Sequence, residues 1–162
     1  MQKWKIALAL VVLAALLGAA MGEGADAAKT TWRGYALAAT WVTADREAIG
    51  IPSLKDEGLA VLVQLTPEEG KIALGDVQDN REELTLMDAD GDIWPATHCV
   101  YHNVQIDPVT MSPTIDPQQD NVELIFVLEG KDESALEGAQ LVIAGAEPGS
   151  IPLDGVTREK PE

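Results

Sequence analysis

The chain has 162 residues, with 11 Lys or Arg against 27 Asp or Glu, so its formal net charge at pH 7 is -16. This excess of acid excludes a protein that binds nucleic acid by electrostatic attraction. A hydrophobic share of 46% is enough to build the core of one ordinary domain, which excludes a disordered acidic segment. The single cysteine, Cys99, excludes an intramolecular disulfide.

Residues 1–27 have the pattern of a secretory signal peptide. Two lysines give a basic start, and residues 6–21 form an uncharged apolar run of 16 residues. A membrane helix needs about 20 apolar residues. This run is therefore short for the alternative, an uncleaved membrane anchor. Small-residue cleavage patterns end at residues 22 and 27. We therefore expect an extracytoplasmic protein, periplasmic or secreted, with no membrane insertion after signal cleavage.

The mature chain opens with the alternation that is typical of β-strands. Residues 34–44 alternate large and small side chains and predict the first strand. Residues 44–58 contain glycine, proline and mixed charges, which suits a connection with one helical turn. Residues 58–66 are almost continuously apolar and predict a strand that is central or buried on both faces.

The middle of the chain predicts a hairpin, a further strand and a long loop. Residues 82–94 hold two apolar runs around an Asp-Gly turn at 88–92. Residues 98–106 alternate again, with Val100, Val104 and Ile106 on one face. Residues 107–121 carry three prolines, which excludes a central strand and favours a long loop.

Three further apolar segments predict the closing strands, at residues 122–128, 139–145 and 150–153. The polar tail at 156–162 is expected to fray. Seven or eight short strands without a long helix predict an all-β protein, an antiparallel immunoglobulin-like β-sandwich over residues 28–155. A small barrel with the same number of strands is the alternative.

A resemblance supports this fold at the level of pattern. The segment ELTLMDADGDIW at 83–94, the Phe-bearing strand at 122–128 and the closing strands AQLVI and SIPL are similar to an exported bacterial immunoglobulin-like family of unknown function, often found on lipoproteins. The resemblance covers roughly residues 59–153. The chain lacks the lipid-bearing cysteine of such lipoproteins, and the resemblance implies no site residues.

Alternating carboxylates at Asp88, Asp90 and Asp92 suggest a weak calcium site. The EF-hand pattern fails, because Gly91 stands at the fourth position of the loop and Cys99 at the twelfth. The alternative is a calcium site of another type, built from this turn and a neighbouring loop of an exported module. The other interpretation, which we prefer, is a hairpin turn whose Asp side chains accept hydrogen bonds from backbone amides. No cofactor is expected, with calcium as the alternative.

A periplasmic metal-handling protein that uses His98, His102 or Met111 is a second alternative. On a strand, four residues span about 13 Å, so the two imidazoles do not share one ion. Cys99 points to the opposite face from both histidines and is expected to be a slow-reacting structural thiol. The sequence has no recognised catalytic signature, and we expect no enzyme.

The long loop carries the candidate partner-binding residues Val109, Met111 and Ile115. Prolines restrict the loop before binding, so less conformational entropy is lost on association. The alternative is a loop that folds back and caps one end of the sandwich. The sequence therefore predicts an exported, non-catalytic binding or interaction module with a protein or cell-envelope partner.

Overall fold

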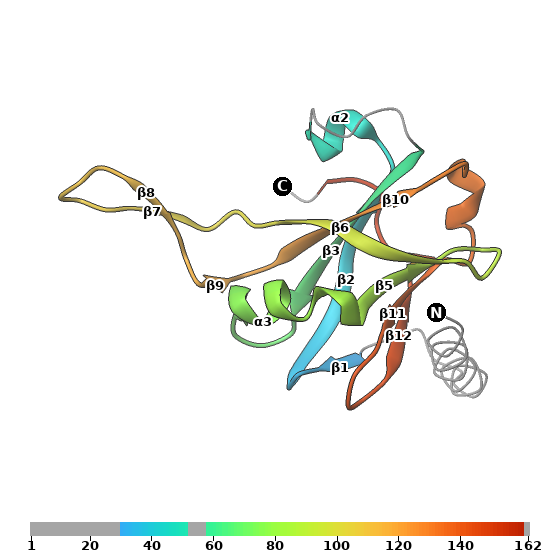
Figure 1. Ribbon diagram of the computed structural model, residues 1–162, viewed down its shortest axis with the longest axis horizontal. Helices are drawn as coiled ribbons and strands as arrows, with labels where there is room; N and C mark the ends of the chain where they lie inside the picture. Colours follow the sequence, from blue (N-terminus) through green and yellow to red (C-terminus); the bar gives the residue numbers. More distant parts are fainter. Residues whose placement is uncertain (1–29, 52–57, 161–162) are drawn as a thin grey trace.

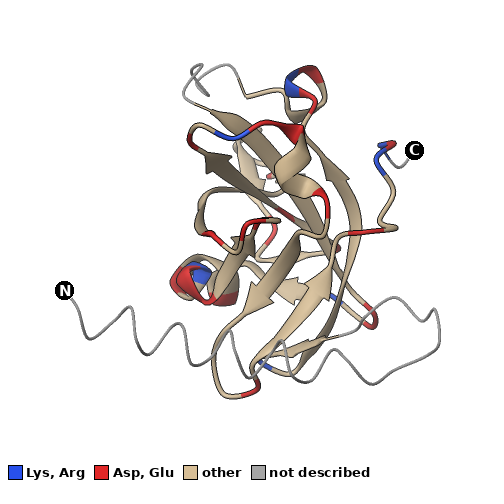
Figure 2. Cartoon of the chain, turned by 90° about the vertical axis from the view of Figure 1, so that its right-hand side faces the viewer, with Lys and Arg blue, Asp and Glu red and all other residues tan. Residues whose placement is uncertain are grey.

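The computed structural model describes residues 30–51 and 58–160. The predicted signal peptide at 1–27 and part of the predicted connection at 44–58 lie outside the described residues. No helix in the described ranges has the length and apolar character needed to cross a membrane. Acidic side chains outnumber basic ones and gather in turns and short helices (Figure 2).

Eight antiparallel strands form one continuous sheet (Figure 1). Along the sheet they are β1 (Thr30–Trp32), β2 (Tyr35–Thr43), β3 (Leu59–Pro67), β10 (Val122–Leu128), β6 (Ile93–Val100), β5 (Leu84–Met87), β11 (Gln140–Ile143) and β12 (Gly149–Pro152). The prediction of an all-β, antiparallel fold is confirmed. The predicted strands at 34–44, 58–66, 82–87, 122–128, 139–145 and 150–153 all correspond to strands of this sheet.

The two edge strands of the sheet meet, so the sheet is nearly a closed barrel. The hydroxyl of Thr30 on β1 donates a hydrogen bond of 3.0 Å to the carbonyl oxygen of Ser150 on β12. A Cβ at Gly149 would lie 2.5 Å from Cγ2 of Thr30, so the approach of the two strands requires glycine there. One nearly closed sheet does not confirm the two separate sheets of an immunoglobulin-like sandwich, and it fits the alternative of a small barrel.

The barrel interior is the main core, and a second cluster lies on the outer face of the sheet. Alternate residues of β3 point to opposite faces, so Val61 and Val63 join the main core while Ala60 and Leu62 join the outer cluster. The expected burial of this strand on both faces is confirmed. The outer cluster also contains Trp41, Ile125 and Ile49, the last on the short helix α2 (Arg46–Ile49).

Residues 157–160 of the C-terminal segment cover the outer cluster, contrary to the expectation that the tail at 156–162 is frayed, of which residues 161–162 lie outside the described residues. The amide of Val42 donates to the carbonyl of Thr157 at 3.0 Å, and the indole of Trp41 donates to the carbonyl of Arg158 at 3.3 Å. The ammonium of Lys160 lies 5.7 Å from the centre of the Trp41 ring. This polar segment packs against the sheet because its backbone carbonyls accept hydrogen bonds from the Val42 amide and the Trp41 indole of β2.

Short elements connect the strands and complete the core. They are β4 (Ile72–Ala73), helix α3 (Leu74–Asp79) and the 3-10 turns η1 (Arg81–Glu83) and η2 (Glu133–Leu136). Glu83 ties η1 to the turn between β1 and β2, because its carboxylate accepts hydrogen bonds from the indole of Trp32 at 2.8 Å and from the guanidinium of Arg33. The Arg33 guanidinium, with the Trp32 indole, holds the pKa of Glu83 below its usual value despite partial burial.

A hairpin projects from the barrel where the sequence predicted one uninterrupted strand at 98–106. β6 ends at Val100, and the chain then forms β7 (Val104–Ile106) and β8 (Pro113–Ile115), which pair only with each other (Figure 1). The predicted strand at 98–106 is therefore interrupted at residues 101–103, and its second part, β7, pairs with β8 instead of continuing β6. The predicted loop at 107–121 contains β8 and also β9 (Gln118–Gln119), which pairs with β4. We call residues 104–115 the arm.

We predict that ending the chain at Val156 exposes Trp41. Loss of the backbone acceptors at Thr157 and Arg158 is expected to lower the free energy of unfolding by about 1–3 kcal/mol. Chemical denaturation measures this loss, and tryptophan emission of the folded protein should shift to longer wavelength. The same truncation in a Trp41→Phe background controls for the other tryptophans and should give no shift. Unchanged stability and emission would contradict a covering role for the tail.

Candidate functional site

The arm has one apolar face and one polar face. Its register pairs Val104 with Ile115, Gln105 with Thr114 and Ile106 with Pro113. Cross-strand partners share a face, and residues two apart along a strand share it too. Val104, Ile106, Pro113 and Ile115 therefore line one face. On the polar face, the hydroxyl of Thr114 donates to the carbonyl of Gln105, whose amide reaches a carboxylate at the base of the arm.

The apolar side chains of the arm are exposed. Among the described residues, the exposed large hydrophobic side chains are Val104, Ile106, Val109, Met111 and Ile115, with exposed fractions from 45% to 87%. All five belong to the arm, whereas the other large apolar residues of the described ranges are at least partly buried. The alternative in which this segment caps one end of the fold is wrong, because capping would have buried these side chains.

The sequence pattern predicted Val109, Met111 and Ile115 as partner-binding residues but not Val104 and Ile106. That pattern placed the latter two on a strand at 98–106, because their alternation continues that of Val100. A hairpin signal was present: two short runs, at 104–106 and 113–115, flank a turn that begins with Asp-Pro. The arm thus brings the three predicted residues together with two more.

The tip of the arm is held by Asp107. One of its carboxylate oxygens accepts hydrogen bonds of 2.8 Å from the amides of Thr110 and Val109, and its carbonyl accepts a third from Met111. The amides of Thr110 and Val109 hold the pKa of Asp107 below its usual value. Met111 has a positive φ of 55°, a left-handed conformation that costs a residue other than glycine about 1–2 kcal/mol. The tip is therefore a defined turn that presents Met111 at an energetic cost.

The base of the arm is fixed by Gln119, whose side chain is buried. Its carbonyl oxygen accepts hydrogen bonds from the amides of His102 at 3.3 Å and Asn103 at 3.1 Å, where the chain leaves β6. Its amide nitrogen donates to the carbonyl of Asp116, where the chain returns from β8. One buried side chain thus joins both strands of the arm at their base, and the pairing of β9 with β4 fixes it to the barrel.

Charged groups surround this base. The Lys71 ammonium lies 3.4 Å from a carboxylate oxygen of Asp120 and 4.0 Å from one of Asp116. Asn103 donates a hydrogen bond of 3.0 Å to the carboxylate of Asp120. This hydrogen bond and the charge of the nearby Lys71 ammonium both lower the pKa of Asp120. The contacts tie the base to the segment before β4, so the direction of the arm is set by several independent groups.

The structure does not bring the predicted transition-metal residues together. His98 lies on β6 with its Nδ1 3.0 Å from the hydroxyl of Thr97, and Met111 lies at the tip of the arm. His102 has its Nε2 3.0 Å from the buried carboxylate of Glu123. In the described ranges, the group of ligand side chains spaced for a metal is Asp88, Asp90 and Asp92.

Cys99 is a partly buried side chain of β6. Burial raises the pKa of its thiol to about 11, with the charge of Glu123 acting in the same direction and that of Arg81 opposing it. Little thiolate forms at neutral pH under these conditions. This agrees with the expected slow-reacting structural thiol.

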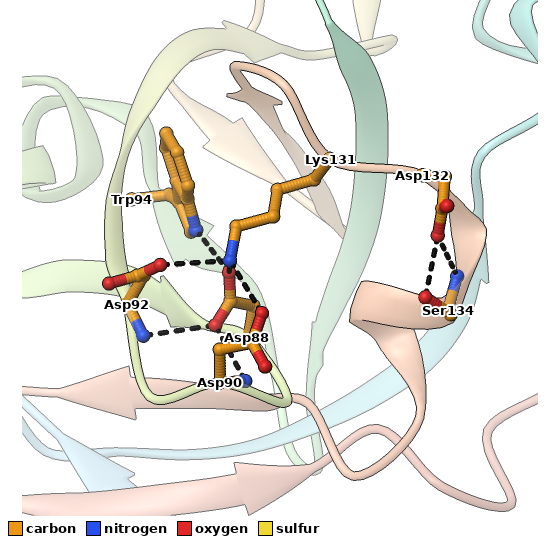
Figure 3. A network of polar contacts seen from close by, with 7 residues as sticks. All are labelled: Asp88, Asp90, Asp92, Trp94, Lys131, Asp132 and Ser134. Atoms are coloured by element: carbon orange, nitrogen blue, oxygen red, sulfur yellow. Dashed lines mark hydrogen bonds and ion pairs between the residues drawn. The ribbon is translucent and has the colours of Figure 1, made fainter.

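Asp88, Asp90 and Asp92 converge, as the calcium alternative requires, and together they contact a lysine. The ammonium of Lys131 lies 3.0 Å from a carboxylate oxygen of Asp88, 2.7 Å from one of Asp90 and 2.8 Å from one of Asp92 (Figure 3). These contacts, those with Asp90 and Asp92 above all, raise the pKa of Lys131. Lys131 comes from the turn after β10, and sequence analysis gave no signal for its position.

Asp88 is the structural centre of this group. One carboxylate oxygen accepts hydrogen bonds of 2.9 Å from the amides of Asp90 and Asp92, and the other accepts one of 2.9 Å from the indole of Trp94 (Figure 3). Burial acts to raise the pKa of Asp88, but the donors of Trp94, Lys131 and the backbone outweigh it, so the pKa lies below its usual value. The backbone-accepting role that we preferred for this turn is present, and Lys131 supplies a cation to it.

A calcium ion at this turn would compete with the Lys131 ammonium for the same oxygens. Calcium takes six to eight oxygen ligands, and extracellular modules bind it with dissociation constants of about 0.1–1 mM. One oxygen of Asp88 is already used by two backbone amides. The three carboxylates thus form a cation site that is occupied by the ammonium group of Lys131.

Comparison with protein-family models, with curated proteins and with solved structures finds no match for this chain. The resemblance to an exported immunoglobulin-like family therefore stays a prediction from pattern.

We predict that Lys131→Met makes the turn responsive to calcium. Removal of the ammonium leaves three converging carboxylates, and millimolar calcium is expected to raise the Tm of the variant by about 3–5 °C while leaving the wild type almost unchanged. Thermal unfolding with and without calcium measures both.

Two further variants control this experiment. Lys160→Met removes the same charge away from the turn and should gain no response, and adding Asp90→Asn to Lys131→Met should abolish the response. A calcium-dependent rise of several degrees in the wild type would contradict our account and would favour the calcium-binding module.

Proposed function

We propose that this protein is an exported, non-catalytic binding module that contacts its partner through the apolar face and tip of the arm. The observation that carries the proposal is that the large apolar side chains exposed in residues 30–51 and 58–160, five in number, all belong to the arm. Exposed apolar patches on a folded domain mark interaction sites. A protein or a component of the cell envelope is the partner class that we propose, and nucleic acid is disfavoured by the charge of -16.

The energetics of the arm favour binding. Each of the five side chains is about half exposed or more, so covering it contributes about 1 kcal/mol, or several kcal/mol for the whole face. The hydrogen bonds of Asp107 at the tip and Gln119 at the base order the arm in the free protein. Association therefore loses less conformational entropy than the folding of a mobile loop would.

The chemistry of the other candidate groups supports a non-catalytic role. The thiol of Cys99, with its pKa of about 11, is a poor nucleophile at neutral pH. The carboxylate of Asp88 is surrounded by donors from Trp94, Lys131 and the backbone, so it is poorly placed to exchange protons with a substrate. Cys99 and Asp88 therefore have structural roles in this proposal, and the arm is the functional element.

The extracytoplasmic location and the immunoglobulin-like assignment are parts of the proposal that come from sequence pattern. The basic start, apolar run and small residues of 1–27 support export with signal cleavage, and the strand pattern supports a relation to immunoglobulin-like domains. The nearly closed sheet keeps a small barrel as the other description of the fold.

We predict that the exported protein begins between residues 23 and 28, because the two cleavage patterns end at residues 22 and 27. Intact-mass measurement of protein recovered outside the cytoplasm gives the start directly. A product that retains Met1 and stays with the membrane fraction would contradict cleavage and favour the anchor.

We also predict that a photoreactive amino acid at position 109 cross-links a discrete partner in the cell of origin. The same amino acid at exposed position 147, in the turn between β11 and β12, is the control and should give no such product. Val104→Ser with Ile115→Ser should abolish the product from position 109 without lowering the Tm by more than about 2 °C, because both side chains are already exposed.

The proposal fails if position 109 gives no product, or if positions 109 and 147 give the same one. It also fails if the product survives Val104→Ser with Ile115→Ser, since binding would then not depend on the apolar face.

A further inference from the structure

The hydrogen bonds at the two ends of the arm fix which backbone groups point outward. The amide of Asp107 donates to the carbonyl of Ser112 at 3.0 Å, and the amide of Asp116 donates to the carbonyl of Asn103 at 2.8 Å. In an antiparallel ladder, hydrogen-bonded pairs alternate with pairs that are not hydrogen-bonded. The latter pairs are therefore Val104 with Ile115 and Ile106 with Pro113, and their N–H and C=O groups face away from the hairpin.

The two outer edges of the arm differ. On β8, one of the two outward positions is Pro113, which has no N–H, so this edge lacks a donor needed for a further strand. On β7, Val104 and Ile106 both direct an N–H and a C=O outward. In the part of the chain that the structure describes, β7 pairs with β8 alone, so the β7 edge has no neighbouring strand.

We propose that the β7 edge takes up an extended segment of the partner as a third strand, and that this segment alternates apolar residues between flanking Lys or Arg residues. The proposal rests on the function assigned to the arm above and names how the partner is recognised. Main-chain hydrogen bonds to Val104 and Ile106 would supply affinity, as in other cases of strand addition. Apolar side chains of the added strand would extend the face formed by Val104, Ile106 and Ile115.

The negative charge around the arm favours a partner segment with basic residues. Residues 101–121 carry Asp107, Asp116 and Asp120 and contain no Lys or Arg, and the nearby Lys71 is already paired with Asp120 and Asp116. A segment with basic flanks is therefore attracted to the arm. A second copy of this chain would bring two charges of -16 together, which opposes pairing of β7 with itself.

The first experiment selects binders from a random linear peptide library on the wild-type protein. A variant with residues 104–115 replaced by a Gly-Ser linker serves for counter-selection. We expect peptides with alternating apolar residues and Lys or Arg at the ends. Enrichment of acidic peptides, or no enrichment over the counter-selection variant, would overturn the proposal.

The second experiment separates strand addition from docking on side chains. Ile106→Pro removes an outward N–H that the arm does not use internally, and Ile106→Ala removes the side chain alone. Affinity for a synthetic copy of the selected peptide should be about tenfold weaker for Ile106→Pro than for Ile106→Ala, the loss of about one hydrogen bond. The matched pair Ile115→Pro and Ile115→Ala, on the β8 edge, should differ much less.

Hydrogen exchange of the wild type gives a readout that needs no variant. The synthetic peptide should slow exchange of the amides of Val104 and Ile106 and leave that of Ile115 unchanged. Thermal unfolding of each variant checks that the barrel folds, and the exchange result decides the proposal if a proline variant does not fold.

The failures are distinguishable. If the peptide binds Ile106→Pro as tightly as Ile106→Ala, or protects neither amide of β7, strand addition is wrong while the arm remains the binding element. If it binds equally well to the protein with residues 104–115 replaced, the proposed function of the arm is wrong too. Sedimentation of the protein alone should give a monomer, and a dimer that Ile106→Pro abolishes would identify a second copy as the occupant.

Discussion

The buried carboxamide of Gln119 decides where the barrel ends and the arm begins. It accepts hydrogen bonds from the backbone of His102 and Asn103 as the chain leaves β6, and it donates to the carbonyl of Asp116 as the chain returns. The backbone groups that it pairs belong to residues that are exposed or half-buried, where each hydrogen bond contributes about 1 kcal/mol. Because one side chain satisfies groups of both strands, the strands leave the barrel together and pair with each other.

This division separates apolar residues that build the fold from those that remain exposed. The barrel interior and the cluster around Trp41 are complete without the arm, and both are closed by contacts distant in sequence, from β1 to β12 and from Thr157 to β2. The arm therefore has no core to enter. The positive φ of Met111 adds strain at its tip, a pattern that occurs where function opposes stability.

Most strands of the sheet were predictable from sequence because they carry an alternating or continuously apolar pattern, whereas the three residues of β1 carry neither and were not predicted. β3 and β10 are read from apolar runs, and β5 with β6 from an Asp-Gly turn. The end of β6 was not predictable, because Val104 and Ile106 continue its alternation and only Gln119, at a distance along the chain, ends it. The convergence of Asp88, Asp90 and Asp92 is local and was predicted, whereas Lys131 approaches Asp92 from 39 residues away. Periodicity indicates which face of a sheet a residue occupies, but it does not indicate which strand is its neighbour. The approach of β1 to β12, which nearly closes the sheet, could therefore not be predicted from the sequence of either strand.

The central claim is that the arm is an ordered projection, preformed for binding, and backbone 15N relaxation of the free protein tests it most directly. The account predicts order parameters of about 0.85 through β7 and β8, equal to those of the barrel strands, with a fall confined to the tip. Values below about 0.6 throughout residues 104–115 would show a mobile loop and would contradict the account.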